Sequence, residues 1–575
     1  MKTFLKFLKP YTAWVVLTVV FIAAQSFSDL FLPDLNASVI DKGVMQGDMG
    51  AVLYYGLLML VVAIIVGLCT LGTTYFSTKA SLAYGRDMRK ALFTKVQAFS
   101  QSDLDKFGTP SLITRTTNDI NQIQQMMQML LRTMITTPIL LFGGIVMCIK
   151  QSPKLSLILV VVVPIIAVIA VYSMKKSHPW FKKQQKQVDL LNQLLREKLS
   201  GIRVVRAFVR QDYEEKRYDK ANKDMVTIAI RGHLYMTAMM PLVSLFMNFA
   251  TLAAYYLGAI EIQAGGFEIG KLTAFVTYLT QILMSVTMSS MMMNMIPRAA
   301  TSIGRINEIL NHEPSIQDEG AEDKKLGAFQ GLEFRDVSFS YPEAGRPVLE
   351  HISFRTGPGE TTAIIGSTGS GKSTLINLIP RIYDASEGQI LINGVDIRNV
   401  SQAELRSHLG VVPQKALLFD GTISSNLRYG KADATEEDMW HALEVAQGKD
   451  FVEKMNGQLS ASISQGGSNV SGGQRQRLAI ARAIIRRPDV YIFDDSFSAL
   501  DFKTDAKLRA ALSQETQGAA VLIVAQRVTT VLGADRIIVL DEGKIAGIGK
   551  HKELMETCPV YKEIVLSQLS EEEVA

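Results

Sequence analysis

One octapeptide has the composition and spacing of a phosphate-binding loop. It is Gly366-Ser367-Thr368-Gly369-Ser370-Gly371-Lys372-Ser373, which follows a strand-like run at 362–365 and precedes a helix-like run at 374–379 that begins with Thr374. Glycines let backbone N–H groups and a helix N-terminus face a polyphosphate. Lys372 would pair with the β and γ phosphates of a nucleotide, and Ser373 would bind Mg²⁺. A chance turn rich in glycine and serine would not require these flanking elements.

Two further segments extend this prediction. The apolar run 490–493 ends in Asp494, as a strand that presents a carboxylate to Mg²⁺ beside a nucleotide must. The alternative is a buried strand whose last residue caps a helix. Between the two motifs lies the tetrapeptide Ser471-Gly472-Gly473-Gln474.

With this tetrapeptide shortly before the Asp494 strand, the chain resembles the ATP-binding cassette (ABC) transporters. The resemblance implies ATP and Mg²⁺ as ligands. It also implies that Tyr341 stacks on adenine and that Gln414 senses Mg²⁺ and faces the membrane domain. In this family each ATP lies between the loop of one cassette and the Ser-Gly-Gly-Gln signature of another, so Ser471–Gln474 would complete a partner's site.

Two positions depart from the family pattern. Asp495 stands where the family has the glutamate that polarises the attacking water, and Gln526 stands where it has a histidine. Aspartate is one methylene shorter, so its carboxylate would lie about 1 Å or more from the place of a general base, a displacement that can cost about 100-fold. Weak hydrolysis at this chain's own site is therefore predicted; the alternative is tolerated drift in an active enzyme. Gln465-Gly466 also replaces an acidic-basic pair, with an effect that the sequence does not define.

Composition points to a membrane protein. Of 575 residues, 48% are hydrophobic and 20% charged, and six apolar stretches have about the length that a bilayer requires. They lie near 14–32, 51–76, 131–149, 155–174, 239–260 and 272–295. The spans exclude soluble ABC ATPases that act on DNA or ribosomes, and a net charge of +5 is too small to indicate a nucleic-acid partner. Three cysteines without paired spacing indicate neither a zinc site nor disulfides.

The two long gaps between spans, 77–128 and 176–232, carry most of the cations and are predicted to be cytoplasmic. Both keep a helical periodicity, so the spans should continue as long helical arms. The family resemblance implies a coupling helix at each tip, near 102–107 and near 210–214. The first would reach the partner's cassette less and the second more.

The predicted fold is therefore an α-helical membrane domain of six transmembrane helices with long cytoplasmic extensions. It is fused to an α/β P-loop nucleotide-binding domain with a helical signature subdomain. The expected boundaries are 1–311 for the membrane domain with its two coupling loops, 312–330 for a linker, and 331–570 for the cassette. The chain is expected in the cell (inner) membrane as a multi-pass protein, with its cassette in the cytoplasm.

The chain resembles the degenerate-site subunit of bacterial heterodimeric ABC exporters of the multidrug type. The resemblance implies one half of an ATP-driven exporter that moves hydrophobic or amphipathic compounds, multiple drugs among them, out of the cell, with a second half-transporter as its partner and a heterodimer favoured. A lipid flippase, a peptide exporter and a non-transporting ABC sensor are the alternatives. Methionines enrich the sixth span (Met284, Met288, Met291, Met292, Met293 and Met295), where they would line a cavity or face lipid. Asp29, near the outer end of the first span, would bind a cation, form an outer gate or lie among headgroups.

Overall fold

The chain consists of two compact units. A computed structural model describes residues 6–292, 295–318, 324–342 and 344–569. The helical unit comprises Met1–Gln97 and Thr109–His312, and the α/β unit comprises Ala98–Gly108 and Glu313–Ala575. The α/β unit therefore includes a short segment that the sequence places at the tip of the first helical arm.

The helical unit contains six helices that are long and apolar enough to cross a membrane, in agreement with the predicted spans. Its helices, in the part of the chain that the structure describes, are η1 (Lys9–Tyr11), α2 (Thr12–Ser38), the π-helical η2 (Val39–Val44), α3 (Met49–Gln97), α5 (Thr109–Thr114), the π-helical η3 (Arg115–Asp119), α6 (Ile120–Gln151), α7 (Leu157–Ser200), α8 (Ile202–Ala207), α9 (Gln211–Gln263), α10 (Ile269–Met292) and α11 (Met295–Asn311). With 49, 44 and 53 residues, α3, α7 and α9 far exceed the ~20 residues that a bilayer needs. The predicted helical arms are thus present.

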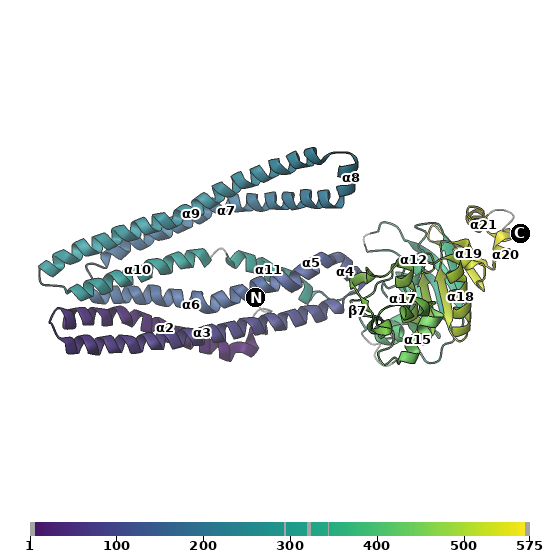
Figure 1. Ribbon diagram of the computed structural model, residues 1–575, viewed down its shortest axis with the longest axis horizontal. Helices are drawn as coiled ribbons and strands as arrows, with labels where there is room; N and C mark the ends of the chain where they lie inside the picture. The colour runs from purple at the N-terminus through teal and green to yellow at the C-terminus, as the bar shows by residue number, and fades with distance from the viewer. Residues whose placement is uncertain (1–5, 293–294, 319–323, 343, 570–575) are drawn as a thin grey trace. The chain divides into compact units, whose positions relative to one another are not determined.

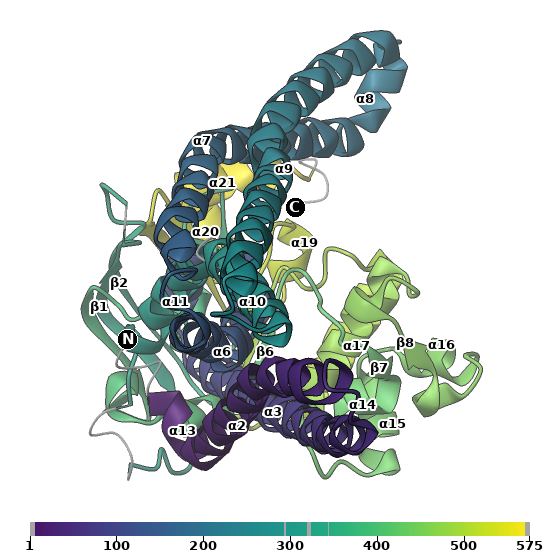
Figure 2. The same ribbon diagram turned by 90° about the vertical axis from the view of Figure 1, so that its left-hand side faces the viewer.

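The long helices pack in neighbouring pairs. In both views α7 runs along α9 and α2 along α3 (Figures 1 and 2). Between α6 and α10 the approach is close at Gly144, where a Cβ atom would lie 2.8 Å from Cγ1 of Ile282. The buried hydroxyl of Tyr278 in α10 donates a 2.7 Å hydrogen bond to the carbonyl oxygen of Leu30 in α2. These contacts tie α2, α6 and α10 into one core.

Three expectations for this unit stay predictions or lie partly outside the described residues. At the second arm's tip a short helix, α8 (Ile202–Ala207), precedes the expected position 210–214, which contains the start of α9, and the coupling role of this tip stays a prediction. Gly201 ends α7, and Val209, with a left-handed φ of 51°, separates α8 from α9. The helical rod that contains Asp29 continues to Val44, beyond the predicted span 14–32, and the role of Asp29 at the outer end of that span stays a prediction. The side chains of Met291, Met292, Met293 and Met295 lie outside the described part.

The α/β unit is built on a six-stranded sheet with the order β12-β11-β3-β10-β9-β6, parallel except for the edge strand β12. A four-stranded antiparallel sheet, β2-β1-β4-β5, and a two-stranded one, β7-β8, accompany it. The strands are β1 (Leu332–Phe339), β2 (Leu349–Thr356), β3 (Thr361–Gly366), β4 (Glu387–Ile392), β5 (Val395–Asp396), β6 (Leu409–Val412), β7 (Gly421–Thr422), β8 (Ser462–Ile463), β9 (Val490–Asp494), β10 (Ala520–Val524), β11 (Arg536–Asp541) and β12 (Lys544–Gly549).

Helices cover this sheet and form a subdomain beside it, as the predicted α/β class requires. They are α4 (Gln101–Phe107), α12 (Lys372–Leu378), η4 (Ile397–Asn399), α13 (Gln402–Ser407), α14 (Ile423–Leu427), α15 (Glu436–Val445), α16 (Lys449–Glu453), η5 (Gln458–Ser460), η6 (Gln465–Gly467), α17 (Gly472–Ile484), α18 (Phe502–Glu515), α19 (Val528–Val531), α20 (His551–Thr557) and α21 (Pro559–Leu566). Strand β3 is buried on both faces, because Ala363 and Ile365 enter one hydrophobic core and Ile364 enters the other. Because β3, β10 and β9 are parallel, the loops at their carboxyl ends lie at the same edge of the sheet.

Candidate functional site

The loop between β3 and α12 has the backbone shape of a phosphate cradle. Gly369 and Gly371 adopt left-handed φ angles of 88° and 96°. A Cβ atom on Gly371 would lie 2.7 Å from Cδ2 of Leu349, so this position requires glycine for space as well as for conformation. Ser367, Thr368 and Gly369 lie outermost, whereas Ser370 is buried. The loop therefore turns tightly and leaves its middle open to a ligand.

Lys372 places its ammonium group inside this loop. Its Nζ donates to the carbonyl oxygens of Gly366 at 2.8 Å and of Ser367 at 2.7 Å, and the side chain is 9% exposed. Burial lowers the pKa of Lys372, and the nearby carboxylates of Asp495 and Asp494 oppose that shift. A partly desolvated ammonium at this place suits a polyphosphate, which would replace the weaker carbonyl contacts.

Asp494 ends β9 next to the start of α12, where Ser373 Oγ donates a 3.3 Å hydrogen bond to its Oδ1. Burial raises the pKa of Asp494, an effect that the negative charge of Asp495 reinforces and that Ser373 and Lys372 oppose. A buried carboxylate beside a hydroxyl is a donor set that Mg²⁺ accepts. Gln414, which follows β6, could add a carbonyl oxygen. These three residues fit Mg²⁺, which when bound would neutralise charge on the phosphates.

Asp495 lies between the two glutamines that the sequence singled out. Its Oδ2 accepts a hydrogen bond from Gln526 Nε2 at 3.0 Å and one from Gln414 Nε2 at 3.3 Å. Asp495 also has a left-handed φ of 45°, which is uncommon for a residue with a side chain. The fold thus brings together three residues that are far apart in the sequence.

Tyr341 lies beside the first turn of α12. Its hydroxyl is hydrogen-bonded to Thr374 Oγ1 at 3.1 Å, and its ring meets those of Phe339 and Tyr383 edge-on at 4.9 and 5.3 Å. These contacts fix the ring while the residue remains partly exposed. A base could therefore stack on its free surface.

Ser471–Gln474 form the N-terminus of α17 rather than part of this cluster. Ser471 caps the helix, because its Oγ accepts from the N–H of Gln474 at 3.3 Å while Gln474 Oε1 accepts from the N–H of Ser471 at 2.9 Å. Ser471 and Gly472 are exposed. Across the described residues, no hydrogen bond joins this segment to the loop 366–373. The signature is thus presented outward, as the predicted role in a partner's site requires.

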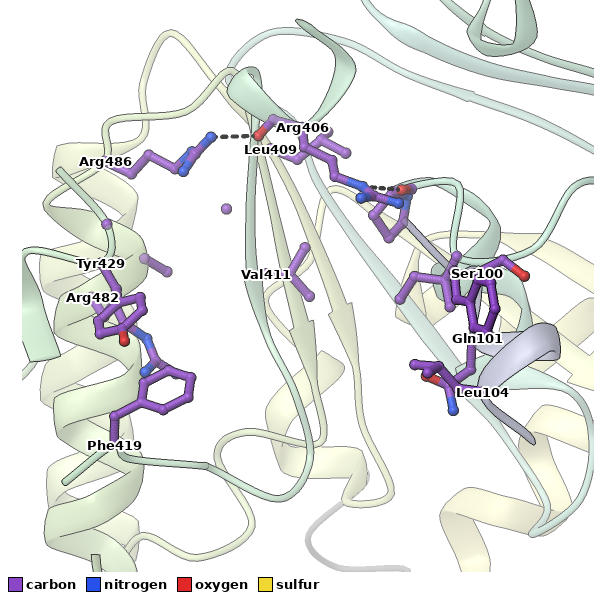
Figure 3. Close-up of a pocket in the computed structure, with 16 residues that line it drawn as sticks. Ser100, Gln101, Leu104, Arg406, Leu409, Val411, Phe419, Tyr429, Arg482 and Arg486 are labelled. Carbon is purple, nitrogen blue, oxygen red and sulfur yellow. Dashed lines mark hydrogen bonds between the residues drawn. The ribbon is translucent and has the colours of Figure 1, made fainter. Parts of the chain in front are cut away.

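The sequence did not reveal a groove of about 540 Å³ beside α4 in the same unit. Figure 3 shows Phe419, Tyr429 and Arg482 along one wall and Val411 of β6 in the middle. Along the other wall lie Ser100, which caps α4, and Gln101 and Leu104 of α4. The Phe419 and Tyr429 rings stack at 4.4 Å. The sequence offered one signal for this groove, the aromatic residues Phe419 and Tyr429, which lie on either side of α14.

Segment α4 packs on the α/β unit through polar contacts. Tyr383 Oη donates to Asp105 Oδ2 at 3.2 Å, and the N–H of Ser315 donates to Asp103 Oδ2 at 3.1 Å. A capping box at Ser100 and Asp103 fixes the start of the helix. These contacts make α4, the segment predicted as the first coupling helix, part of the α/β unit, and its coupling role stays a prediction.

Comparisons with known proteins agree with this architecture. The ABC transporter transmembrane region matches residues 15–286, and the ABC transporter domain matches 349–498. An uncharacterised ABC transporter ATP-binding protein of Mycobacterium tuberculosis is 40% identical over 565 residues, which cover 98% of this chain and 97% of that protein. A protein of Desulfotalea psychrophila named ATP-dependent lipid A-core flippase is 32% identical over 532 residues and 91% of each chain. A bacterial Atm1-family ABC exporter with ATP bound has the same fold, with a TM-score of 0.79, 24% identity, and coverage of 98% of this chain and 99% of that one.

The chain therefore belongs to the ABC transporter family and has the architecture of an exporter half-transporter, one membrane domain followed by one ATP-binding cassette. The ABC domain implies ATP binding coupled to transport. With six spanning helices, the chain is a multi-pass membrane protein whose nucleotide-binding domain is cytoplasmic.

Proposed function

We propose that this chain is one half of a heterodimeric exporter of hydrophobic and amphipathic compounds, in which its own ATP site binds nucleotide but hydrolyses it slowly. In this proposal Ser471–Gln474 complete the partner's site, where rapid hydrolysis occurs. Lys372 and the loop 366–373 hold the phosphates, Ser373, Asp494 and Gln414 bind Mg²⁺, and Tyr341 stacks on adenine.

The state of Asp495 is the observation that carries the proposal. A general base must have a carboxylate oxygen within hydrogen-bond reach of the attacking water. Here the Asp495 side chain is short, and its Oδ2 already accepts from Gln526 and Gln414. Gln526 is neutral, so it cannot supply the positive charge that a protonated histidine could bring to the γ phosphate. Both changes weaken hydrolysis, while the groups that would bind ATP remain in place.

Two exposed surfaces favour a dimer. In the α/β unit the groove beside α4 presents Phe419 and Tyr429, which are 41% and 62% exposed. In the helical unit the tip of the second arm presents Phe208 and Val209, which are 73% and 80% exposed. Apolar residues exposed together mark interaction surfaces. We infer that the second-arm tip of a partner fills the groove of this chain.

The test restores the family residues at the two altered positions. The full chain, purified alone in lipid nanodiscs, should turn over ATP slowly, whereas Asp495→Glu combined with Gln526→His should raise the steady-state rate by about 100-fold. Adding Ser471→Ala to that double variant should abolish the gain, because each site in the homodimer would then lack a complete signature. Asp495→Asn, as the matched control, should stay as slow as the unmodified chain. An unmodified chain that alone matches the double variant would refute the proposal.

A lipid flippase is the second candidate, since one relative bears that name. Its test is ATP-dependent movement of fluorescent phospholipids between the leaflets of vesicles that contain this chain with the partner that co-purifies. Flipping at the rate of dye export would favour the flippase, and dye export without flipping would favour the exporter.

A further inference from the structure

A polar cavity of about 430 Å³ lies inside the helical unit, among α2, α3, α6 and α10. Hydroxyl and amide groups make up most of its lining, together with two methionines, one leucine and one cation, Arg132 of α6. The lining contains no carboxylate. Such a wall is suited to a ligand of negative rather than positive charge.

Arg132 lies near the cytoplasmic boundary of the hydrocarbon core. Helix α6 ends on the outer side at Gln151, and at 1.5 Å per residue the stretch from Arg132 to that end spans about 28 Å. The core itself is ~30 Å thick. Within the described chain, the guanidinium of Arg132 has no hydrogen-bond or ion-pair partner. Arg132 is exposed, and at this boundary a cation costs little to keep charged, so within the described chain its guanidinium is available to an anionic group.

Other groups around the cavity also lack partners. Thr73 is 2% exposed, and its Oγ1 makes no hydrogen bond to any described residue. The Oε1 atom of Gln281 is likewise buried and unpartnered in the described chain. By contrast, Thr136 and Ser285 donate to carbonyl oxygens of their own helices. A buried hydroxyl without a partner costs free energy, so a ligand oxygen that accepts a hydrogen bond from Thr73 would bind favourably, whereas Gln281 Oε1 would need a donor, such as a hydroxyl group of the ligand.

The cavity also has an apolar wall. Met284 and Met288 of α10 line it and are 48% and 52% exposed, and Leu140 of α6 also lines it. Flexible thioethers accommodate alkyl chains of different shapes. The two described methionines of the sixth span thus line a cavity, next to the polar groups.

We propose that this cavity binds the anionic head of an acidic amphiphile, a phosphate or a carboxylate, with Arg132 as its charged anchor and the methionines against its tail. The proposal rests on the proposed export function and names the substrate class for it. A planar guanidinium can hold two oxygens of either acid, which a neutral head cannot provide with the same strength.

The test compares three probes that share one fluorescent acyl chain: a lysophosphatidic acid, a fatty acid and a neutral monoacylglycerol. Binding to the full chain is measured by fluorescence anisotropy in micelles of an uncharged detergent. Arg132→Gln should weaken binding of both acids by about tenfold and change monoacylglycerol binding by less than about twofold. Arg132→Lys should keep most of the affinity for the acids. Weaker binding of the phosphate probe alone would identify a phospholipid-type head, and weaker binding of both acids a general anion site.

Lys175→Gln is the matched control. Lys175 of α7 is exposed and lies about 27 Å from the outer start of its helix at Leu157, almost the depth of Arg132, but does not line the cavity. An equal loss of binding in Lys175→Gln, or an equal loss for all three probes in Arg132→Gln, would overturn the assignment.

ATP-dependent movement of the neutral probe in vesicles tests the proposed export function separately. If the neutral probe is transported but the acids bind no more tightly than the neutral probe, only the inference about the anionic head fails. If no probe is transported, the proposed export function fails, while the binding data still decide the role of Arg132.

Discussion

The two units build their polar sites in different ways. In the α/β unit the phosphate loop is a continuous stretch, 366–373, placed at the end of β3, with the end of β10 beside it and that of β9 one strand further along the sheet. In the helical unit the cavity takes single side chains from four helices, at positions between Gln25 and Met288. One site depends on backbone conformation at a strand end, and the other on which faces of long helices meet.

This difference determines how each site tolerates change. A loop whose glycines hold left-handed φ angles fails when the backbone is altered, because N–H groups that would bind phosphate are fixed by that conformation. A cavity between helix faces tolerates single substitutions, because the helices persist without any one side chain and only the binding preference shifts. The geometry of the proposed ATP site is thus fixed by its backbone, whereas single substitutions can change the binding preference of the cavity in the helical unit.

The largest expected effect is at the centre of the loop. Lys372→Ala should weaken ATP binding to the full chain by about 100-fold, because the phosphates would lose a partly desolvated cation. Titration with a fluorescent ATP analogue in the presence of Mg²⁺ measures it. Lys415→Ala, which removes an exposed lysine next to Gln414, is the control and should bind ATP normally. ATP affinity that is unchanged in Lys372→Ala would remove this loop from the site.

The ATP site was more predictable from the sequence than the cavity, because its residues are adjacent in the chain whereas those of the cavity come from four helices. The loop 366–373 and Asp494 were predictable because a strand, a glycine pattern and a helix are adjacent in the chain. The hydrogen bonds that join Asp495 to Gln414 and Gln526 were not, since they depend on the pairing of parallel strands. Arg132 lies at the edge of a predicted span and was not predicted as a site residue, because only helix packing places it in one cavity with Thr73 and Gln281. The separate short helix α8 was not predicted, because neither glycine nor proline marks the turn at Val209 that ends it.

Substitutions at two glycines of the loop distinguish the cost of a left-handed backbone conformation from the cost of a steric clash. Gly371→Ala should destabilise the α/β unit by about 2 to 3 kcal/mol, because it adds a left-handed alanine and a Cβ atom 2.7 Å from Leu349. Gly369→Ala shares the left-handed φ but meets open space, so about 1 kcal/mol is expected. The stabilities of the two variants are compared by urea unfolding of the full chain, with protection of the cassette from protease as the readout. Equal losses would mean that backbone strain alone sets the requirement for glycine.

The helical unit should respond more mildly to loss of a single contact. Tyr278→Phe removes the buried 2.7 Å hydrogen bond to the Leu30 carbonyl and should cost about 1 kcal/mol. The remaining ring keeps its packing against α2, so the fold should persist. Thermal unfolding in detergent measures the change, with Tyr255→Phe as the control because Tyr255 is 47% exposed. A loss as large as that of Gly371→Ala would show that the helical unit is as intolerant as the loop.

The smallest effect concerns the charge of Asp494 when neither nucleotide nor Mg²⁺ is present. Burial raises the pKa of this carboxyl in the folded state above its unfolded value, so the ionised form lowers stability at every pH above the unfolded pKa. Asp494→Asn removes that charge and should raise the Tm of the ligand-free chain by a few degrees at most at pH 7. This gain in Tm should shrink as the pH falls through the folded pKa toward the unfolded value, because Asp494 of the unmodified chain then becomes protonated.

Asp433→Asn, at an exposed position, is the control and should leave the Tm unchanged at both ends of that pH range. With Mg²⁺ and ATP added the order should reverse, since the carboxylate then gains a cation. A stabilisation of Asp494→Asn that persists with Mg²⁺ and ATP would show that Asp494 does not bind the metal.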